Sequence, residues 1–332
     1  MIAIKQKKRS YIKHKKMATA KIRKILYEKE INLHTDSLAY GTVPRIAQEA
    51  GMQKEKTYDY IKMLRNNART CLSGMAEDNF VGLPYLRGCY KNGVDEECDN
   101  CCAISSIALL QEKEEDFSGI YKSITHYTKD GLKFNGKIHI DPSVLTKIHS
   151  GKKCINYMLC YTGEISLADI DTLYTLLQLP FDYPMHNFIF VTKFPKVLWN
   201  KMSTGIKLLN ANGRNIHSVN NVHVVASVGM DKYKHRIDEL RLFDGFLKHV
   251  WYKPLLESMS YHDLSGIDSI RIAVEKARKP RPAKLEWVID RMRMAEDQDV
   301  KAYYDPTSNE QQYHNMRTTQ SFQRILDMMK EL

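Results

Sequence analysis

Short apolar runs that alternate with helical stretches constrain the fold of this 332-residue chain more than any other feature of its sequence. Between the runs lie segments with helical spacing, such as 167–179 and 284–296. The seven runs that read as strands are 80–86, 154–161, 187–192, 222–228, 247–252, 269–274 and 300–304. Strands that alternate with helices predict a parallel sheet with crossover helices. We therefore expect an α/β fold, an incomplete TIM-like (β/α) barrel, over residues 76–310.

The carboxyl ends of the predicted strands carry residues with useful chemistry. In barrels of this kind the reactive groups lie at these ends. The positions that end or follow the predicted strands are Cys89, the loop 161–164, Lys193, Ser227 and Glu275. We expect a functional site at this edge of the sheet.

Three cysteines are the strongest candidates for ligands. Cys98 and Cys101 form a C-x-x-C pair, and Cys89 lies just upstream. Three thiolates are one short of a closed structural zinc site. Such a set either recruits a fourth ligand from elsewhere or leaves one iron of a four-iron cluster open to a small molecule. The residues alone leave both alternatives open.

The segments around these cysteines resemble those of a known family. Gly88-Cys89 is followed by a loop and by Cys98-Asp99-Asn100-Cys101, and a later strand ends in Thr192-Lys193-Phe194-Pro195. Further matching segments, in the same order, are 221–228, 236–237, 253–257, 274–275, 281–282, 286–288 and 300–304. Over roughly residues 80–305 the chain is similar to phage and bacterial proteins of the "gp thirty-seven / gp sixty-eight" type, which are described as radical SAM-like.

The resemblance implies a cofactor and its ligands. It implies a [4Fe-4S] cluster on the three cysteines, with S-adenosylmethionine (SAM) on the fourth iron. Glu164, in Thr162-Gly163-Glu164, looks like the Gly-Gly-Glu element that holds the amino group of SAM in radical SAM enzymes. The alternative for Glu164 is a carboxylate that caps the helix after it. Ser227 and Glu275 are candidates for lining the cofactor pocket.

Some positions depart from the family pattern. Eight residues separate Cys89 from Cys98, where the family usually has six, and Cys102 replaces its tyrosine. We expect Cys102 to be a packing residue. Cys154 and Cys160 lie in an apolar strand, and we expect them in the core, since free cysteine is among the most buried residue types.

A small helical module precedes the barrel. Residues 42–65 read as helix, tight turn and helix, in which Thr42 can cap the first helix and Gly51 supplies the backbone freedom of the turn. The pattern resembles winged-helix DNA-binding domains, with 71–81 as a candidate wing, and we assign residues 17–75 to this domain.

The second helix of this module predicts contact with DNA. A helix-turn-helix presents the outer face of its second helix to the major groove. The side chains expected there include Lys54, Lys56, Thr57 and Tyr60. The alternative is a helical hairpin that packs on the barrel or on a partner protein.

The charge of the chain is uneven. Formal net charge is +11, and the first sixteen residues hold seven basic side chains and no acid: Lys5, Lys7, Lys8, Arg9, Lys13, Lys15 and Lys16. A disordered tail of this kind favours polyanions, although it can also simply solubilise the chain.

We expect a final helix over 311–332. No apolar run approaches the roughly 20 residues that span a bilayer, and residues 1–16 hold no apolar signal core, so we expect a cytoplasmic protein without membrane contact.

Two functions follow from these expectations. The first is a radical SAM-like enzyme that acts on a nucleic acid, with DNA favoured, or on a nucleotide. The second is a non-enzymatic winged-helix protein of DNA regulation or replication, in which the cysteines bind structural zinc.

Overall fold

The computed structural model describes residues 42–54, 57, 80–112, 119–148, 154–275, 280–281 and 283–305. The chain forms two compact units, Met1–Ser73 and Gly74–Leu332. The predicted basic tail over 1–16 and the predicted final helix over 311–332 lie outside the described residues.

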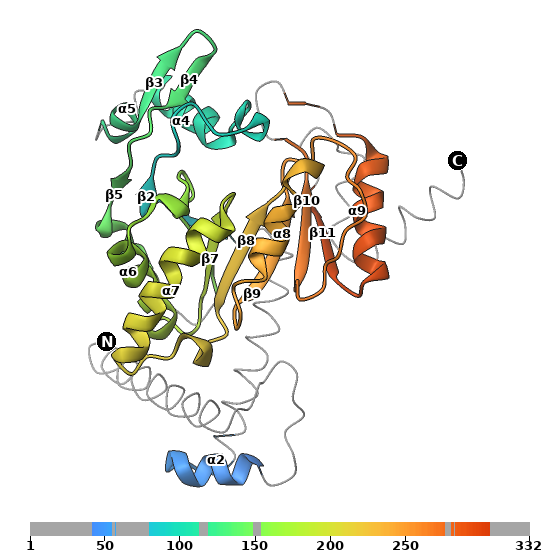
Figure 1. Ribbon diagram of the computed structural model, residues 1–332. Coiled ribbons are helices and arrows are strands. Elements are labelled where there is room, and N and C mark those ends of the chain that lie inside the picture. Colours follow the sequence, from blue (N-terminus) through green and yellow to red (C-terminus); the bar gives the residue numbers. More distant parts are fainter. Residues whose placement is uncertain are drawn as a thin grey trace, which may run out of the picture. The chain divides into compact units, whose positions relative to one another are not determined.

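Seven strands of the larger unit form one parallel sheet in the order β1-β6-β7-β8-β9-β10-β11 (Figure 1). The strands are β1 (Phe80–Leu83), β6 (Asn156–Leu159), β7 (Asn187–Thr192), β8 (Val222–Ser227), β9 (Leu247–Tyr252), β10 (Ser269–Ala273) and β11 (Lys301–Asp305). Each of the seven predicted runs overlaps one of them. The sheet curls into a half-barrel, so the predicted incomplete (β/α) barrel is confirmed.

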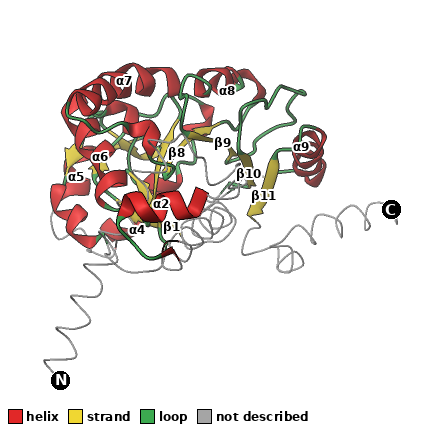
Figure 2. Cartoon of the chain, turned by 90° about the horizontal axis from the view of Figure 1, so that it is seen from below, coloured by secondary structure: helices red, strands yellow, loops and turns green. Residues whose placement is uncertain are grey.

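Helices follow the strands, as crossover connections require. They are α6 (Ile170–Asp182) after β6, α7 (Pro195–Ala211) after β7, α8 (His235–Leu240) after β8 and α9 (Leu285–Asp297) between β10 and β11. Figure 2 shows α6, α7 and α8 along one side of the sheet. The Asp169 carboxylate caps α6 by accepting from the Thr172 amide at 2.8 Å, and Pro195 opens α7, where its missing N–H costs nothing.

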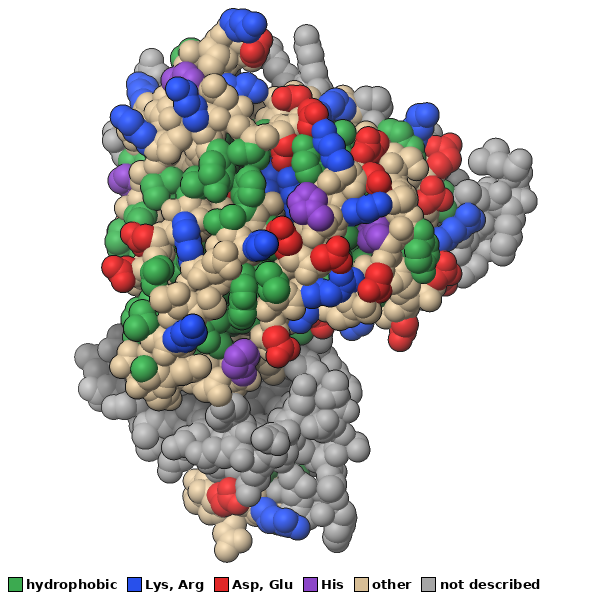
Figure 3. Space-filling model, viewed as in Figure 1, with side chains coloured by type: hydrophobic (Ala, Val, Ile, Leu, Met, Phe, Trp, Pro, Cys, Tyr) green, Lys and Arg blue, Asp and Glu red, His purple; other side chains and the backbone are tan. Residues whose placement is uncertain are grey.

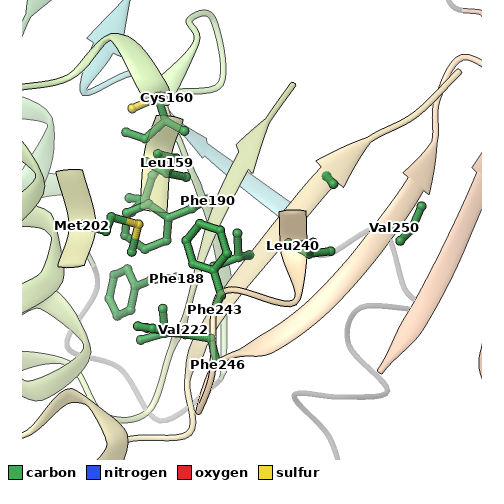
Figure 4. Packing of buried hydrophobic residues seen from close by; sticks show 14 of the residues in the cluster. Leu159, Cys160, Phe188, Phe190, Met202, Val222, Leu240, Phe243, Phe246 and Val250 are labelled. Carbon is green, nitrogen blue, oxygen red and sulfur yellow. The ribbon is translucent and has the colours of Figure 1, made fainter. Parts of the chain in front are cut away.

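The main core lies between the sheet and these helices. Successive side chains of a strand point to opposite faces, so alternate residues of β7 and β8 face the helices. Phe188 and Phe190 meet Met202 of α7 there, and Figure 4 shows the packing together with Phe243. Each side chain of this kind stabilises the fold by about 1.5–3 kcal/mol relative to an exposed one.

The opposite face of the sheet is more polar. Ile189, Val225 and Trp251 form a small apolar cluster on it. On the same face His223 Nδ1 lies 2.9 Å from His249 Nε2. Burial lowers the pKa of His249 to about 3, so this ring is neutral at physiological pH.

Several small elements lie beyond the carboxyl ends of the central strands (Figure 1). Strand β2 (Leu86–Arg87) pairs in antiparallel orientation with β5 (His139–Ile140). The others are α4 (Cys102–Glu112), α5 (Ile120–Ile124) and the hairpin of β3 (Thr125–Thr128) and β4 (Gly131–Phe134). Single 3-10 turns complete the unit: η1 (Glu96–Cys98), η2 (Pro142–Lys147), η3 (Ile165–Leu167), η4 (Ile216–Ser218) and η5 (Asp231–Tyr233).

The smaller unit contains α2 (Thr42–Ala50), which is the first predicted helix. Gly51 follows it with a φ of +64°, as the predicted turn requires. Lys54 is exposed, but Thr57 is buried and its hydroxyl donates to the Gln53 carbonyl at 3.1 Å. The prediction that Thr57 lies on the outer face is therefore wrong, since this small side chain turns back onto the backbone.

Other predictions for this unit fall on residues without a description. Lys56 and Tyr60 lie outside the described residues, as does most of the candidate wing over 71–81. The last two residues of that segment, Phe80 and Val81, belong instead to β1 of the half-barrel. Within the described part of the chain, no helix combines the length and the apolar character needed to cross a bilayer.

Candidate functional site

The three predicted ligand cysteines lie on one segment at the carboxyl edge of the sheet. Cys89 comes two residues after β2, Cys98 ends η1, and Cys101 directly precedes α4. The segment turns at Gly93, whose φ is +83°. A Cβ atom on Gly93 would lie 2.6 Å from the Cβ of Cys98, so only glycine lets the loop fold onto this cysteine.

The thiols share a half-buried setting. Cys89, Cys98 and Cys101 are all partly exposed, and Cys89 and Cys101 pack against the apolar cluster of Ile107, Ile124, Leu132 and Phe134. Burial raises the pKa of Cys89 well above the usual thiol value, and Glu164, Cys101 and Cys98 raise it further. Burial also raises the pKa of Cys101 to about 11. Both shifts favour the neutral thiol.

The loop after β6 lies against the first cysteine. The Gly88 amide donates to the Thr162 carbonyl at 3.1 Å, and the Glu164 amide donates to the Gly88 carbonyl at the same distance. A Cβ atom on Gly163 would lie only 2.7 Å from the Leu86 carbonyl oxygen, so glycine is needed for this approach. The predicted Thr162-Gly163-Glu164 element is thus placed beside Cys89.

The Glu164 carboxylate is buried and fully engaged by the chain. It accepts hydrogen bonds from the Thr192 hydroxyl at 2.5 Å, the Ser166 amide at 3.1 Å and the Lys193 amide at 3.1 Å. The Ser166 contact caps η3, which is the alternative role that the sequence left open. Glu164 therefore ties together the ends of β6 and β7 next to the cysteines.

Two acids of the cysteine loop form buried ion pairs with Lys193, which follows β7, and Arg236, which lies in α8. Lys193 Nζ lies 3.0 Å from Asp95 Oδ1 and 3.1 Å from Glu97 Oε2. The Arg236 guanidinium lies 2.8 Å from Asp95 Oδ2 and 2.6 Å from Glu97 Oε2. The side chains of Glu97 and Arg236 are 0% and 4% exposed. Burial would raise the pKa of Asp95, but Lys193 and Arg236 hold it below its usual value.

Residues after β8 extend this contact. The Gly229 amide donates to Glu97, Lys232 Nζ lies 2.6 Å from Glu96 Oε1, and the Tyr233 hydroxyl donates to Glu96 at 2.8 Å. Figure 3 shows acidic and basic side chains intermixed over α8 and the strand ends beside it. The segment from Gly229 to Arg236 thus holds residues 95–97 from one side.

Ser227 and Glu275, the two other predicted cofactor contacts, also lie at this edge. The Ser227 hydroxyl donates to the Lys253 carbonyl at 3.1 Å, and the Ser227 carbonyl accepts from Arg236 at 2.8 Å. Glu275 accepts from Asn100 at 2.8 Å and from the Arg281 amide at 2.7 Å. Glu275 therefore contacts the cysteine loop through Asn100, whereas Ser227 is linked to it only through Arg236.

Three residues of this site were not expected from the sequence to be ion-pair partners: Asp95, Glu97 and Arg236. A pattern that could have indicated them is present. Two acids, Asp95 and Glu97, lie inside the cysteine loop, and two basic residues, Lys193 and Arg236, follow the third and fourth predicted strands. Of the three cysteines that were not expected to bind metal, Cys160 is buried, Cys154 is half-buried and Cys102 is exposed.

The arrangement bears on which metal group the cysteines can hold. Among the residues that the structure describes, no three His, Cys, Asp or Glu side chains converge closely enough to hold a single metal ion. A structural zinc needs four ligands around one point. A four-iron cluster makes a different demand, since each of its cysteines binds a different iron. Three half-buried thiols on one loop are a donor set of the number that leaves one iron of such a cluster open.

The fold and the site together define an α/β half-barrel protein with a three-cysteine loop at the carboxyl edge of its sheet. The chain belongs to the DUF5131 family, described as proteins of unknown function, whose model matches residues 84–330. Neither a curated protein nor a solved structure matches the chain. The matched residues include all three cysteines and the contacts of their loop described above.

Gly93→Ala should lower the free energy of unfolding by more than the cost of the left-handed backbone conformation alone. A left-handed residue other than glycine costs about 1–2 kcal/mol, and here the added methyl group would also push on Cys98. Gly213→Ala is the matched control, because Gly213 has a φ of +74° and nothing within 4 Å of its added Cβ. Urea unfolding should show a larger loss of stability for Gly93→Ala than for Gly213→Ala. Equal losses of stability would contradict the close packing of Gly93 on Cys98.

Proposed function

We propose that the half-barrel binds a [4Fe-4S] cluster through Cys89, Cys98 and Cys101 and acts as a radical SAM-like enzyme on a nucleic acid or nucleotide. The observation that carries the proposal is the position of the Thr162-Gly163-Glu164 loop beside Cys89, the first of three cysteines on one loop at the carboxyl edge of the sheet. The resemblance to three-cysteine radical SAM-like phage proteins supports the same reading.

Each part of the site has a role under this proposal. When bound, the cluster and SAM would supply an electron and a radical that abstracts hydrogen from the substrate. The three cysteines would hold the cluster, and Glu164 would fix the loop after β6 beside Cys89. Ile107, Ile124, Leu132 and Phe134 would keep water from the thiols on their side.

The zinc alternative has less support. A closed structural site requires a fourth ligand beside the three thiols. The described residues contain no group of three or more His, Cys, Asp or Glu side chains that could hold one ion. We therefore place the iron–sulfur reading first.

The nucleic-acid part of the proposal comes from the smaller unit. Helix α2 and the turn at Gly51 fit the first half of a helix-turn-helix, and Lys54 is exposed just after the turn. The basic residues of the first sixteen positions add positive charge. Both features favour a polyanion, with DNA as the first candidate.

Anaerobic reconstitution with iron and sulfide tests the enzymatic proposal. The intact chain should bind about four irons and show broad thiolate-to-iron absorption. After reduction it should convert SAM to 5'-deoxyadenosine. Stoichiometric zinc uptake without iron would refute the proposal in favour of the zinc alternative. A cluster without SAM cleavage would refute the radical chemistry alone.

Removal of residues 1–73 tests the nucleic-acid part. Because this segment is a separate compact unit, residues 74–332 should remain folded. Their affinity for duplex DNA should fall at least about tenfold at low salt, since most of the counterion release would be lost. Gel shifts at two salt concentrations, on both chains, measure this. Equal binding by the shorter chain would place DNA contact on the half-barrel instead.

A further inference from the structure

Lys193 contacts a proposed cluster ligand directly. Its ammonium nitrogen lies 3.2 Å from the sulfur of Cys98, within hydrogen-bond distance for sulfur. The same nitrogen lies 3.0 Å from Asp95 Oδ1. Cys98 therefore has a positive charge beside its sulfur, on the side that faces the sheet.

The backbone at Lys193 is fixed from two directions. Its amide donates to Glu164 at 3.1 Å, and the next amide, of Phe194, donates to the Thr192 hydroxyl at 2.9 Å. The Phe194 ring packs against Tyr90, beside Cys89, with 4.9 Å between ring centroids. Lys193 thus starts from a rigid strand end, and its side chain reaches the cysteine loop from a defined point.

The charges around Lys193 are balanced within the chain. Asp95 and Glu97 face Lys193 and Arg236, so two carboxylates meet two bases. Lys193 is the base of this group that also reaches a sulfur. Hydrogen bonds to the sulfurs and the net charge nearby are two of the factors that set the reduction potential of an iron–sulfur cluster.

We infer that Lys193 is a positioning residue, which holds the Cys98 sulfur against the end of β7 and places a positive charge on that ligand. The inference rests on the proposed function for its effect on the cluster. A cation and a hydrogen bond at a ligand sulfur favour the more negative, reduced cluster, so Lys193 would raise the reduction potential of a cluster bound there. Its effect on the loop does not depend on iron.

Three variants separate this role from general loss of charge. Asp95→Asn serves as the background variant. The double variant Asp95→Asn with Lys193→Met lacks one acid and one base of the buried group, so the group stays neutral as in the unaltered chain. Lys232→Met is the matched control. Lys232 also pairs with the cysteine loop, through Glu96, but its side chain is 47% exposed. Lys232→Met therefore removes a positive charge beside the same loop and leaves the buried ion pairs intact.

The first readout is hydrogen exchange in the iron-free protein. The Cys98 amide donates to the Asp95 carbonyl at 2.9 Å, and its exchange reports the order of the loop. Relative to Asp95→Asn alone, the double variant should exchange there at least about tenfold faster, whereas Lys232→Met should change the rate of the intact chain little. Equal rates in the double variant and its background would overturn the positioning role, whether or not iron binds.

The second readout is a redox titration of the reconstituted cluster. Its midpoint potential should be lower in the double variant than in Asp95→Asn alone, and the shift should exceed that caused by Lys232→Met. An unchanged potential would overturn the electrostatic part of the inference. If the proposed function fails, the unaltered chain takes up no iron, which distinguishes that outcome from failure of the inference. The hydrogen-exchange result would then still decide whether Lys193 holds the loop.

Discussion

Cys98→Ala should reduce the iron bound after anaerobic reconstitution from about four atoms per chain to background, because each thiolate holds one corner of the cluster and only three are offered. Cys89→Ala and Cys101→Ala should have the same effect. Iron and sulfide analysis, together with the visible spectrum, measure the loss. Retention of the cluster in Cys89→Ala would show that the eight-residue spacing between Cys89 and Cys98 has separated the first cysteine from the other two.

Two other cysteines provide matched controls for this loss. Cys102 is the neighbour of Cys101 but is exposed, and Cys160 is buried in the core at the end of β6. Cys102→Ala and Cys160→Ala should therefore both keep the full iron content. A loss in Cys102→Ala that matched the loss in Cys101→Ala would reassign the third ligand.

The strands of the half-barrel could be predicted because parallel strands buried on both faces read as continuous apolar runs. Residues 187–192 and 247–252 match β7 and β9 to the residue. The first run was predicted as one strand over 80–86, but the structure ends β1 at Leu83 and begins β2 at Leu86. Pro84 lies between them, and proline has no N–H to donate to a sheet.

The β3–β4 hairpin could not be predicted in the same way. Its strands have four residues each, and Tyr127 is 74% exposed although it lies in β3. A short, half-exposed strand lacks the apolar run on which the prediction depended. Its turn carries Asp130-Gly131, a dipeptide typical of hairpins, and the φ of Gly131 is +105°.

The ligand cysteines could be predicted because their spacing is local, whereas their support is not. Glu97 meets Arg236 across 139 positions of the chain, and Glu275 meets Asn100 across 175. No local pattern specifies which acid a given base will reach. Only the parallel order of the strands, which brings all carboxyl ends to one edge, places these residues together.

Arg236→Met should destabilise the iron-free protein by about 3–5 kcal/mol, because it leaves two buried carboxylates with only Lys193 to neutralise them. The guanidinium contacts Asp95, Glu97 and the Ser227 carbonyl, and its side chain is almost wholly buried. Urea unfolding measures the change as a lower midpoint at an unchanged slope.

Arg214→Met is the control for this variant. Arg214 also pairs with an acid, Asp182 at 3.2 Å, and also lies over an aromatic ring, that of Phe181. Both partners of this pair are well exposed, so the loss should be only about 0–1 kcal/mol. Equal losses in the two variants would contradict the argument that burial makes the Arg236 contacts costly to break.

A double variant separates the unpaired charge from the lost packing. Adding Glu97→Gln to Arg236→Met removes the acid that the arginine leaves behind, and Gln keeps an oxygen that can accept from the Gly229 amide. The double variant should therefore lose less stability than the sum of the two single variants, by about 1–3 kcal/mol. Strict additivity would mean that Arg236 stabilises the cysteine loop through its packing on Tyr233, 4.2 Å from the ring centroid, and not through its charge.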